Sequence, residues 1–179
     1  LIASFQIHEP DQLDHALPMP DGLPDPETVP DFKTRMEPYK EQMGEWYTRP
    51  RPIDLRFISD PTSPTAQPTQ QLWFRADGKL PDDPLLHVCV ATYASDMTLL
   101  DSIFNAHGKK WEDGNVMGAS LDHAMWFHRP FRADEWLLYD QMSPSASGAR
   151  GLGEGRIFSQ SGELVVSVVQ EGLVRVINR

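Results

Sequence analysis

The chain has 179 residues, and its 16 Lys and Arg against 26 Asp and Glu give a formal net charge of −10. This balance argues against a surface for nucleic acid or anionic membranes, because both require clustered Lys and Arg. Apolar residues make up 40% of the chain, enough for a packed core, and no apolar run is long enough to span a bilayer. Cys89 is the only cysteine, which excludes an intrachain disulfide and suits a cytoplasmic protein.

The first part of the chain is acidic and rich in proline. Residues 1–8 begin with a short strand-like run, and residues 9–45 hold ten acidic residues against three basic ones. Of the 16 prolines, 14 lie between Pro10 and Pro84. Because proline fixes φ and lacks an amide donor, we predict that residues 9–50 form an extended, solvated connector with a short helix near 32–46.

Residues 51–179 are predicted to form one α+β unit that starts with two strands and a helix. The strands are expected over 52–58 and 71–75. The helix begins at Pro84, because Asp83 can cap free amides and proline is tolerated at the first helical position. The following residues are apolar almost all round, so we expect this helix to be buried on most sides, with Cys89 in the core. After a break at 93–96, the helix resumes over 97–104.

Four strands are predicted to complete this unit, over residues 116–129, 135–142, 150–159 and 163–176. Turn signals separate them at 129–130, 143–148 and 161–162. Two strands, a buried helix and four further strands indicate an antiparallel sheet wrapped around a central helix. The glycine-rich run at 151–155 precedes a strand rather than a helix, which favours close packing or a bulge over a phosphate-binding loop.

A weak internal repeat relates the start of the chain to its last strand. Residues 1–6 and residues 165–170 are both short apolar runs that end in glutamine. This pattern suggests a second copy of the same unit before the connector. The similarity extends over six residues only, so chance explains it equally well.

Nucleophilic catalysis and metal binding find little support in the sequence. Ser120, Asp122 and His123 have the residue types of a catalytic triad, but on one extended strand Asp122 and His123 would point to opposite faces. His123 and His128 also differ in strand parity, and no second group of ligands accompanies them. We therefore predict no metal and no cofactor.

Two polar residues in apolar surroundings are more informative. Asp96 interrupts the most apolar helix, where a carboxylate must be hydrogen-bonded or reach water, so it is either a helix cap or a general base. Gln170 follows a run that is apolar on both faces, and a buried amide needs partners for its oxygen and its nitrogen. It is either a structural bridge or a group that holds a water, and the spacing leaves both pairs of interpretations open.

The segment SLDHAMWFHRPF at residues 120–131 resembles the signature of the acyl-CoA thioesterase II family. Further segments that fit the family are residues 73–78, 93–96, 135–139, 145–151 and 169–172. The resemblance is close from about residue 70 to 179 and loose in the connector. It implies a hotdog fold and two hotdog domains in one chain. Residues 1–8 would then be the last strand of a first hotdog, 9–50 the connector, and 51–179 the second hotdog.

The resemblance also implies the hydrolysis of fatty acyl-CoA thioesters to free acid and coenzyme A. The family's catalytic Asp, Thr-or-Ser and Gln fall on Asp96, Ser120 and Gln170. Asp96 would act as general base for a water positioned by the other two, with no metal, prosthetic group or covalent acyl-enzyme. The expected partners are the acyl-CoA substrate and either the first hotdog domain or a second copy of this chain, paired through the sheet.

Two alternatives remain at the level of sequence. One is a hotdog that binds acyl-CoA without turnover, against which the retained Asp96, Ser120 and Gln170 argue. The other is a hotdog hydratase or dehydratase acting on enoyl or hydroxyacyl thioesters. That chemistry usually requires a histidine beside a carboxylate on the central helix, and His87 has no evident carboxylate partner.

Overall fold

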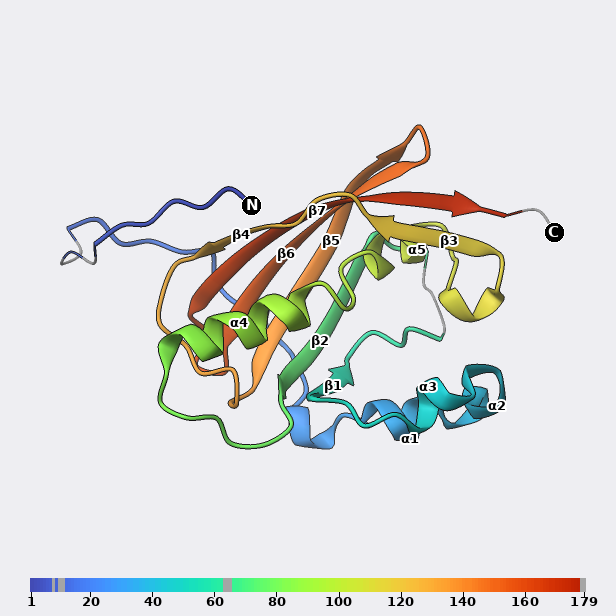
Figure 1. Ribbon diagram of the computed structural model, residues 1–179, viewed down its shortest axis with the longest axis horizontal. Helices are drawn as coiled ribbons and strands as arrows, with labels where there is room; N and C mark the ends of the chain where they lie inside the picture. Colours follow the sequence, from blue (N-terminus) through green and yellow to red (C-terminus); the bar gives the residue numbers. More distant parts are fainter. Residues whose placement is uncertain (8, 10–11, 63–65, 178–179) are drawn as a thin grey trace.

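The structure is a computed structural model that describes residues 1–7, 9, 12–62 and 66–177. Within these residues, seven strands form one antiparallel sheet: β1 (Ile53–Phe57), β2 (Thr69–Ala76), β3 (Val116–Ser120), β4 (Ala124–Phe127), β5 (Leu137–Ser147), β6 (Arg150–Ser159) and β7 (Leu164–Val176). The order across the sheet is β1-β2-β5-β6-β7-β3, and β4 also pairs with β7. Helix α4 (Pro84–Ser95) crosses one face of this curved sheet, and the shorter α5 (Asp101–Ala106) follows it (Figure 1).

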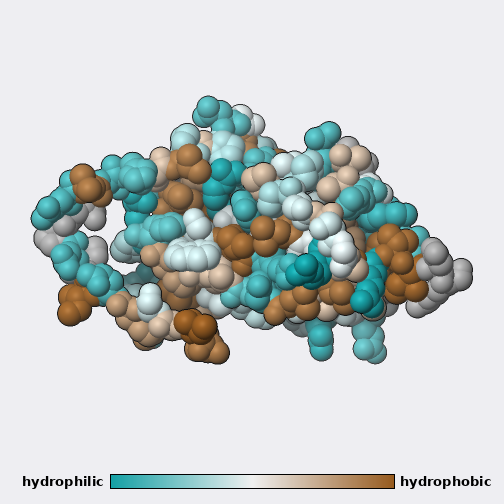
Figure 2. Space-filling view, turned by 90° about the horizontal axis from the view of Figure 1, so that it is seen from above, coloured by the Kyte–Doolittle hydropathy of each residue, from teal (hydrophilic) through white to brown (hydrophobic). Residues whose placement is uncertain are grey.

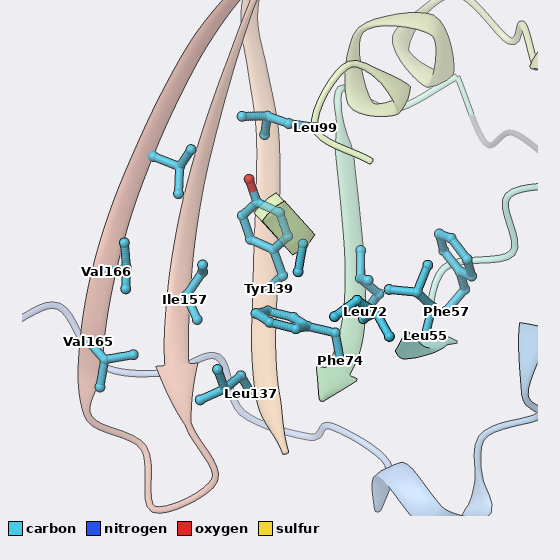
Figure 3. Packing of buried hydrophobic residues seen from close by; sticks show 13 residues of the cluster. Leu55, Phe57, Leu72, Phe74, Leu99, Leu137, Tyr139, Ile157, Val165 and Val166 are labelled. Atoms are coloured by element: carbon cyan, nitrogen blue, oxygen red, sulfur yellow. The ribbon is translucent and has the colours of Figure 1, made fainter. Parts of the chain in front are cut away.

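The main core fills the space between this face of the sheet and the segment from α4 to α5. Alternate residues of the central strands point inward, among them Phe74, Tyr139 and Ile157, as expected for strands with one face on the core. Leu99, from the turn between the two helices, packs against them (Figure 3). The predicted antiparallel sheet around a central helix is therefore confirmed.

Two of the predicted strand boundaries are wrong. The single strand expected over 116–129 is two strands, β3 and β4. Ser120 pairs with Gly172 and Ala124 with Val169, so an advance of four residues along this edge matches an advance of three residues along β7. The extra residue is a bulge, which removes residues 121–123 from the ladder. The turn expected over 143–148 is also shorter than predicted. Strand β5 continues to Ser147, and only Gly148 and Ala149 turn, both with the positive φ that a tight hairpin requires.

The glycine-rich run lies in β6 and confirms the prediction of close packing. A Cβ atom at Gly151 would lie 2.5 Å from Cγ2 of Ile103, and one at Gly155 would lie 2.3 Å from Cε2 of Tyr139. Both distances are shorter than real Cβ contacts. The glycines therefore allow the helical segment and a buried ring to approach the sheet.

The start of α4 follows the prediction, but its burial does not. The Asp83 side chain accepts a hydrogen bond from the amide of Leu85, with Pro84 at the first helical position. The helix meets the sheet mainly through small residues such as Ala91 and Ala94, so its opposite side stays open. Cys89 is exposed, and the predictions of a helix buried on most sides and of a core cysteine are wrong.

Part of the connector packs on the outer face of the sheet. Val29 packs with Trp73 and Trp136 in a second apolar cluster, and the Trp73 indole donates to the carbonyl of Pro24. The helical turns of this region are η1 (Pro26–Thr28), α1 (Phe32–Met36), η2 (Glu37–Tyr39), α2 (Lys40–Met43) and α3 (Glu45–Thr48). The short helix near 32–46 is thus present, but the expectation of a solvated spacer is wrong for the part that packs on the sheet.

Residues 1–7 are exposed and form no strand in the structure (Figure 1). Residue 8 lies outside the described residues. The interpretation of residues 1–8 as the last strand of a first hotdog stays a prediction. None of the helices in the described part of the chain is long and apolar enough to cross a membrane.

Candidate active site

Asp96, Ser120 and Gln170 lie together at the end of α4. The amide nitrogen Nε2 of Gln170 donates to Oδ1 of Asp96 at 2.5 Å and to Oγ of Ser120 at 2.7 Å. The Ser120 hydroxyl donates in turn to Oδ1 of Asp96 at 3.2 Å. The three side chains thus form a closed triangle of hydrogen bonds, although 74 residues separate Asp96 from Gln170.

Each member of the triangle comes from a different element. Asp96 is the residue that ends α4, Ser120 is the last residue of β3, and Gln170 lies within β7. Antiparallel pairing of β3 with β7 places Ser120 opposite Gly172, two residues from Gln170 and therefore on the same face. The curvature of the sheet around α4 then brings the strand residues to the end of the helix.

The sequence left two interpretations of Asp96 open, a helix cap or a general base, and the structure shows the contacts that this residue makes. Its backbone amide closes the C-terminal end of α4 by donating to the carbonyl of Ala94. Its carboxylate is bonded to Gln170 and Ser120 rather than to free amides of a following helix. About 54% of the Asp96 side chain is exposed, so water reaches the carboxylate. The Asp96 carboxylate is therefore a hydrogen-bond acceptor that is held by two donors and reached by water, and its role as a general base stays a prediction.

Gln170 is fully buried and connects the other two residues. Its Nε2 makes both of its hydrogen bonds within the triangle. Its oxygen Oε1 is buried and accepts no hydrogen bond from the described residues. Gln170 thus bridges Asp96 and Ser120 through its nitrogen.

The Ser120–Asp122–His123 triad does not form. The Asp122 carboxylate accepts a hydrogen bond from the backbone amide of Glu171, which helps to hold the bulge. His123 instead approaches α4: its Nε2 lies 2.9 Å from Oγ of Ser95, and its Nδ1 lies 3.8 Å from Oδ1 of Asp96. The sequence did not indicate His123 as a neighbour of Asp96. The alternation of side chains along a strand does not hold across a bulge, where one strand has an extra residue.

His128 faces a different partner. Its Nε2 lies 2.8 Å from Oγ of Ser167, on the strand that neighbours β4. The two histidines of the motif therefore contact different elements, α4 and β7. Across the described residues, no cluster of three or more His, Cys, Asp or Glu could hold a metal ion.

Tyr139 supports the site from within the core. Its hydroxyl donates to the carbonyl of Ser95, the residue before Asp96, at 3.1 Å. Burial, together with the nearby negative charge of Asp96, raises the pKa of Tyr139 well above its ordinary value of 10.0. The phenol therefore remains a neutral donor that fixes the last turn of α4.

A hollow of about 440 Å³ opens next to the triangle. It is lined by residues of α4, the following turn and the bulged edge: Thr92, Tyr93, Asp96, Met97, Ser120, Leu121, Asp122 and His123. A second, mostly apolar hollow of about 350 Å³ continues along the same side of α4, and Tyr93 lines both. Asp96 and Ser120 thus lie at a hollow on the exposed side of α4.

A family model for acyl-CoA thioesterases matches residues 42–173. The chain belongs to the acyl-CoA thioesterase family. It is 39% identical over 187 residues to acyl-coenzyme A thioesterase 8 of Mus musculus, and 34% identical over 179 residues to acyl-CoA thioesterase 2 of Haemophilus influenzae. These alignments include 97% of this chain, but only 58% and 62% of the two relatives. The chain thus spans little more than half the length of the thioesterases it matches.

Solved structures agree with this assignment. A crystal structure of an acyl-CoA thioesterase II from Mycobacterium marinum matches with a TM-score of 0.73 and 43% identity, over 94% of this chain and 59% of that one. A hotdog-fold protein from Alicyclobacillus acidocaldarius matches with a TM-score of 0.68 at 16% identity, which speaks for the fold alone. The predicted hotdog fold is confirmed.

Proposed function

We propose that this acyl-CoA thioesterase family member hydrolyses fatty acyl-CoA thioesters to free fatty acid and coenzyme A. The observation that carries the proposal is the triangle in which Gln170 and Ser120 hold an exposed Asp96 carboxylate beside a hollow. A held carboxylate with access to water is the arrangement that general base catalysis requires.

In the proposed mechanism, Asp96 accepts a proton from a water while the water oxygen attacks the thioester carbonyl carbon. Ser120, which lines the hollow, and Gln170, which donates to both Ser120 and Asp96, would position that water, which replaces a random encounter by a directed attack. The carbon–sulfur bond then breaks, and the thiolate of coenzyme A leaves and recovers a proton. A thiol of ordinary pKa, about 8.5, is a good leaving group, so strong acid assistance is unnecessary.

The test is the release of free coenzyme A from medium-chain and long-chain acyl-CoA, with Ser120→Ala measured in parallel. We expect this variant to lower kcat roughly 10- to 100-fold, because it removes one hydrogen bond to a charged group and one water-orienting group. Ser147→Ala, at an exposed position at the end of β5, is the matched control and should behave like the wild type. Equal activity of the Ser120 variant would contradict its proposed role.

Two further measurements, of acyl-CoA binding and of enoyl-CoA hydration, separate the alternatives. Saturable binding of acyl-CoA without any release of coenzyme A, by this chain and after addition of a first hotdog domain, would indicate a binding protein. Hydration of an enoyl-CoA in place of thioester cleavage would indicate a hydratase. The environment of His87 disfavours the second outcome, because its Nδ1 accepts a hydrogen bond from the amide of Ala133.

We also propose that a second hotdog unit covers the edge of the sheet formed by β3 and β4. Leu121, Trp126 and Phe127 are exposed along this edge, and apolar patches lie among hydrophilic residues on the side seen from above (Figure 2). Exposed apolar side chains on an unpaired sheet edge are typical of an interaction surface. The second unit would be either the first hotdog domain or another copy of this chain.

We expect light scattering to show that this chain alone forms a dimer. Trp126→Glu should shift it toward the monomer, because a charge in an apolar interface must lose its water. Lys79→Glu, which changes the charge of an exposed side chain in the loop after β2, is the control. A monodisperse wild-type monomer would count against pairing of the chain with itself.

A further inference from the structure

His123 lies beside the proposed general base but has no part in the triangle. The bulge after β3 turns its ring toward α4, where the side chain is only 19% exposed. Nε2 is bonded to Oγ of Ser95, whereas Nδ1 is buried and has no hydrogen-bond partner among the described residues. The nearest charge to Nδ1 is Oδ1 of Asp96, at 3.8 Å, which is within ion-pair range.

The position of protons around Ser95 suggests what this nitrogen carries. The direction of the bond between Oγ of Ser95 and Nε2 of His123 depends on the tautomer of the ring. The Ser95 hydroxyl has one proton, for which the carbonyl of Thr92 and Sδ of Met125 are the other acceptors. With the ring proton on Nε2, the lone pair of Nδ1 would face the Asp96 carboxylate, with no donor between the two acceptors. With the ring proton on Nδ1, Nε2 accepts from Ser95 and the N–H of Nδ1 faces the carboxylate, so this tautomer removes the conflict.

Asp96 needs such a partner. It ends α4, where the dipole of the helix is negative and disfavours a carboxylate. Among the described residues, its polar side-chain contacts all converge on Oδ1, from Gln170, Ser120 and the His123 ring. Holding one oxygen in this way leaves Oδ2 as the oxygen that faces an attacking water.

We infer that His123 is a positioning residue for Asp96: a proton on its Nδ1 holds the carboxylate so that Oδ2 is free to accept the proton of the water. The inference rests on the proposed thioester hydrolysis and deepens it. His123 acts through Asp96 and does not touch the reacting atoms. Ser95 and the bulge are the features that aim its ring.

Two substitutions separate this role from a structural one. In His123→Asn the side-chain amide lies where Nδ1 was, so it keeps a donor toward Asp96 but loses the bond to Ser95. In His123→Gln the amide reaches the position of Nε2, so it keeps the bond to Ser95 and loses the group that faces Asp96. We expect kcat to fall roughly 10- to 30-fold in the glutamine variant and less than about 5-fold in the asparagine variant, with KM nearly unchanged in both. His128→Gln, whose wild-type ring bonds to Ser167, is the control.

The reverse ranking, with the asparagine variant slower and less stable than the glutamine variant, would overturn the inference and leave His123 as a structural anchor for Ser95. A second readout does not depend on activity. The ¹⁵N shifts of the His123 imidazole should show the tautomer with the proton on Nδ1 in the wild type, and a move of this proton toward Nε2 in Asp96→Leu. A bare Nδ1 in the wild type would also overturn the inference. A chain that releases no coenzyme A but shows this signature would refute the proposed function and not the pairing.

Discussion

Asp96→Asn is expected to lower kcat for acyl-CoA hydrolysis by about 10³-fold while leaving KM and the unfolding midpoint nearly unchanged. The asparagine oxygen can still accept the hydrogen bonds that Gln170 and Ser120 donate to Oδ1, so the triangle is kept. An amide cannot accept a proton from water, and general base catalysis typically contributes 10²- to 10⁴-fold. Release of coenzyme A, followed under saturating substrate, measures the effect directly.

Asp122→Asn is the matched control, because Asp122 is a second carboxylate that lines the same hollow. From the described residues its side chain accepts a single hydrogen bond, from the amide of Glu171, and an asparagine oxygen can do the same. We expect activity within about threefold of the wild type, a change worth less than 1 kcal/mol in the barrier. Full activity of Asp96→Asn together with an inactive Asp122→Asn would contradict the assignment and indicate Asp122 as the general base.

The fold could be predicted because its signals are local. The Asp83–Pro84 start of α4 and the alternation of apolar residues in the strands each follow from a few neighbouring residues. The set of Asp96, Ser120 and Gln170 came from the resemblance of the motifs. Periodicity alone marked Asp96 and Gln170 as unusual and could not show that they meet.

The errors arise where a contact depends on distant residues. The bulge that brings His123 to Asp96 is a difference of one residue between two strands, which neither strand reveals by itself. Cys89 belongs to an apolar helix, but only the packing of the small residues on its other side leaves it exposed. Two tryptophans in the sequence indicate that part of the connector packs on the sheet. Trp73 and Trp136 lie on the outer face, and large aromatic side chains there favour a segment that covers them.

The second large effect is expected from Gly155→Ala, which should destabilise the fold by about 3 kcal/mol, at the upper end of overpacking substitutions. Its Cβ would lie 2.3 Å from Cε2 of Tyr139 and 3.0 Å from Cζ and from the hydroxyl oxygen. The Tyr139 ring is fully buried, and its hydroxyl holds the carbonyl of Ser95, so the ring has little room to move. Urea denaturation measures the loss, which is large against a typical total stability of about 5–15 kcal/mol.

A double-mutant cycle with Tyr139→Leu tests whether the ring is the cause. Tyr139→Leu alone should be destabilising, because it leaves a cavity and removes the hydrogen bond to Ser95. In the double variant the alanine methyl occupies the space that the ring leaves. The double variant should therefore lose less unfolding free energy than the two single variants together. Simple additivity would mean that Gly155 is needed for its backbone and not for the approach of Tyr139. Gly155→Ala should also lower kcat at temperatures where the protein remains folded, because the Tyr139 ring that it displaces holds Ser95, the residue before Asp96. Such a loss would show that the glycine-rich strand supports the proposed general base through one aromatic ring.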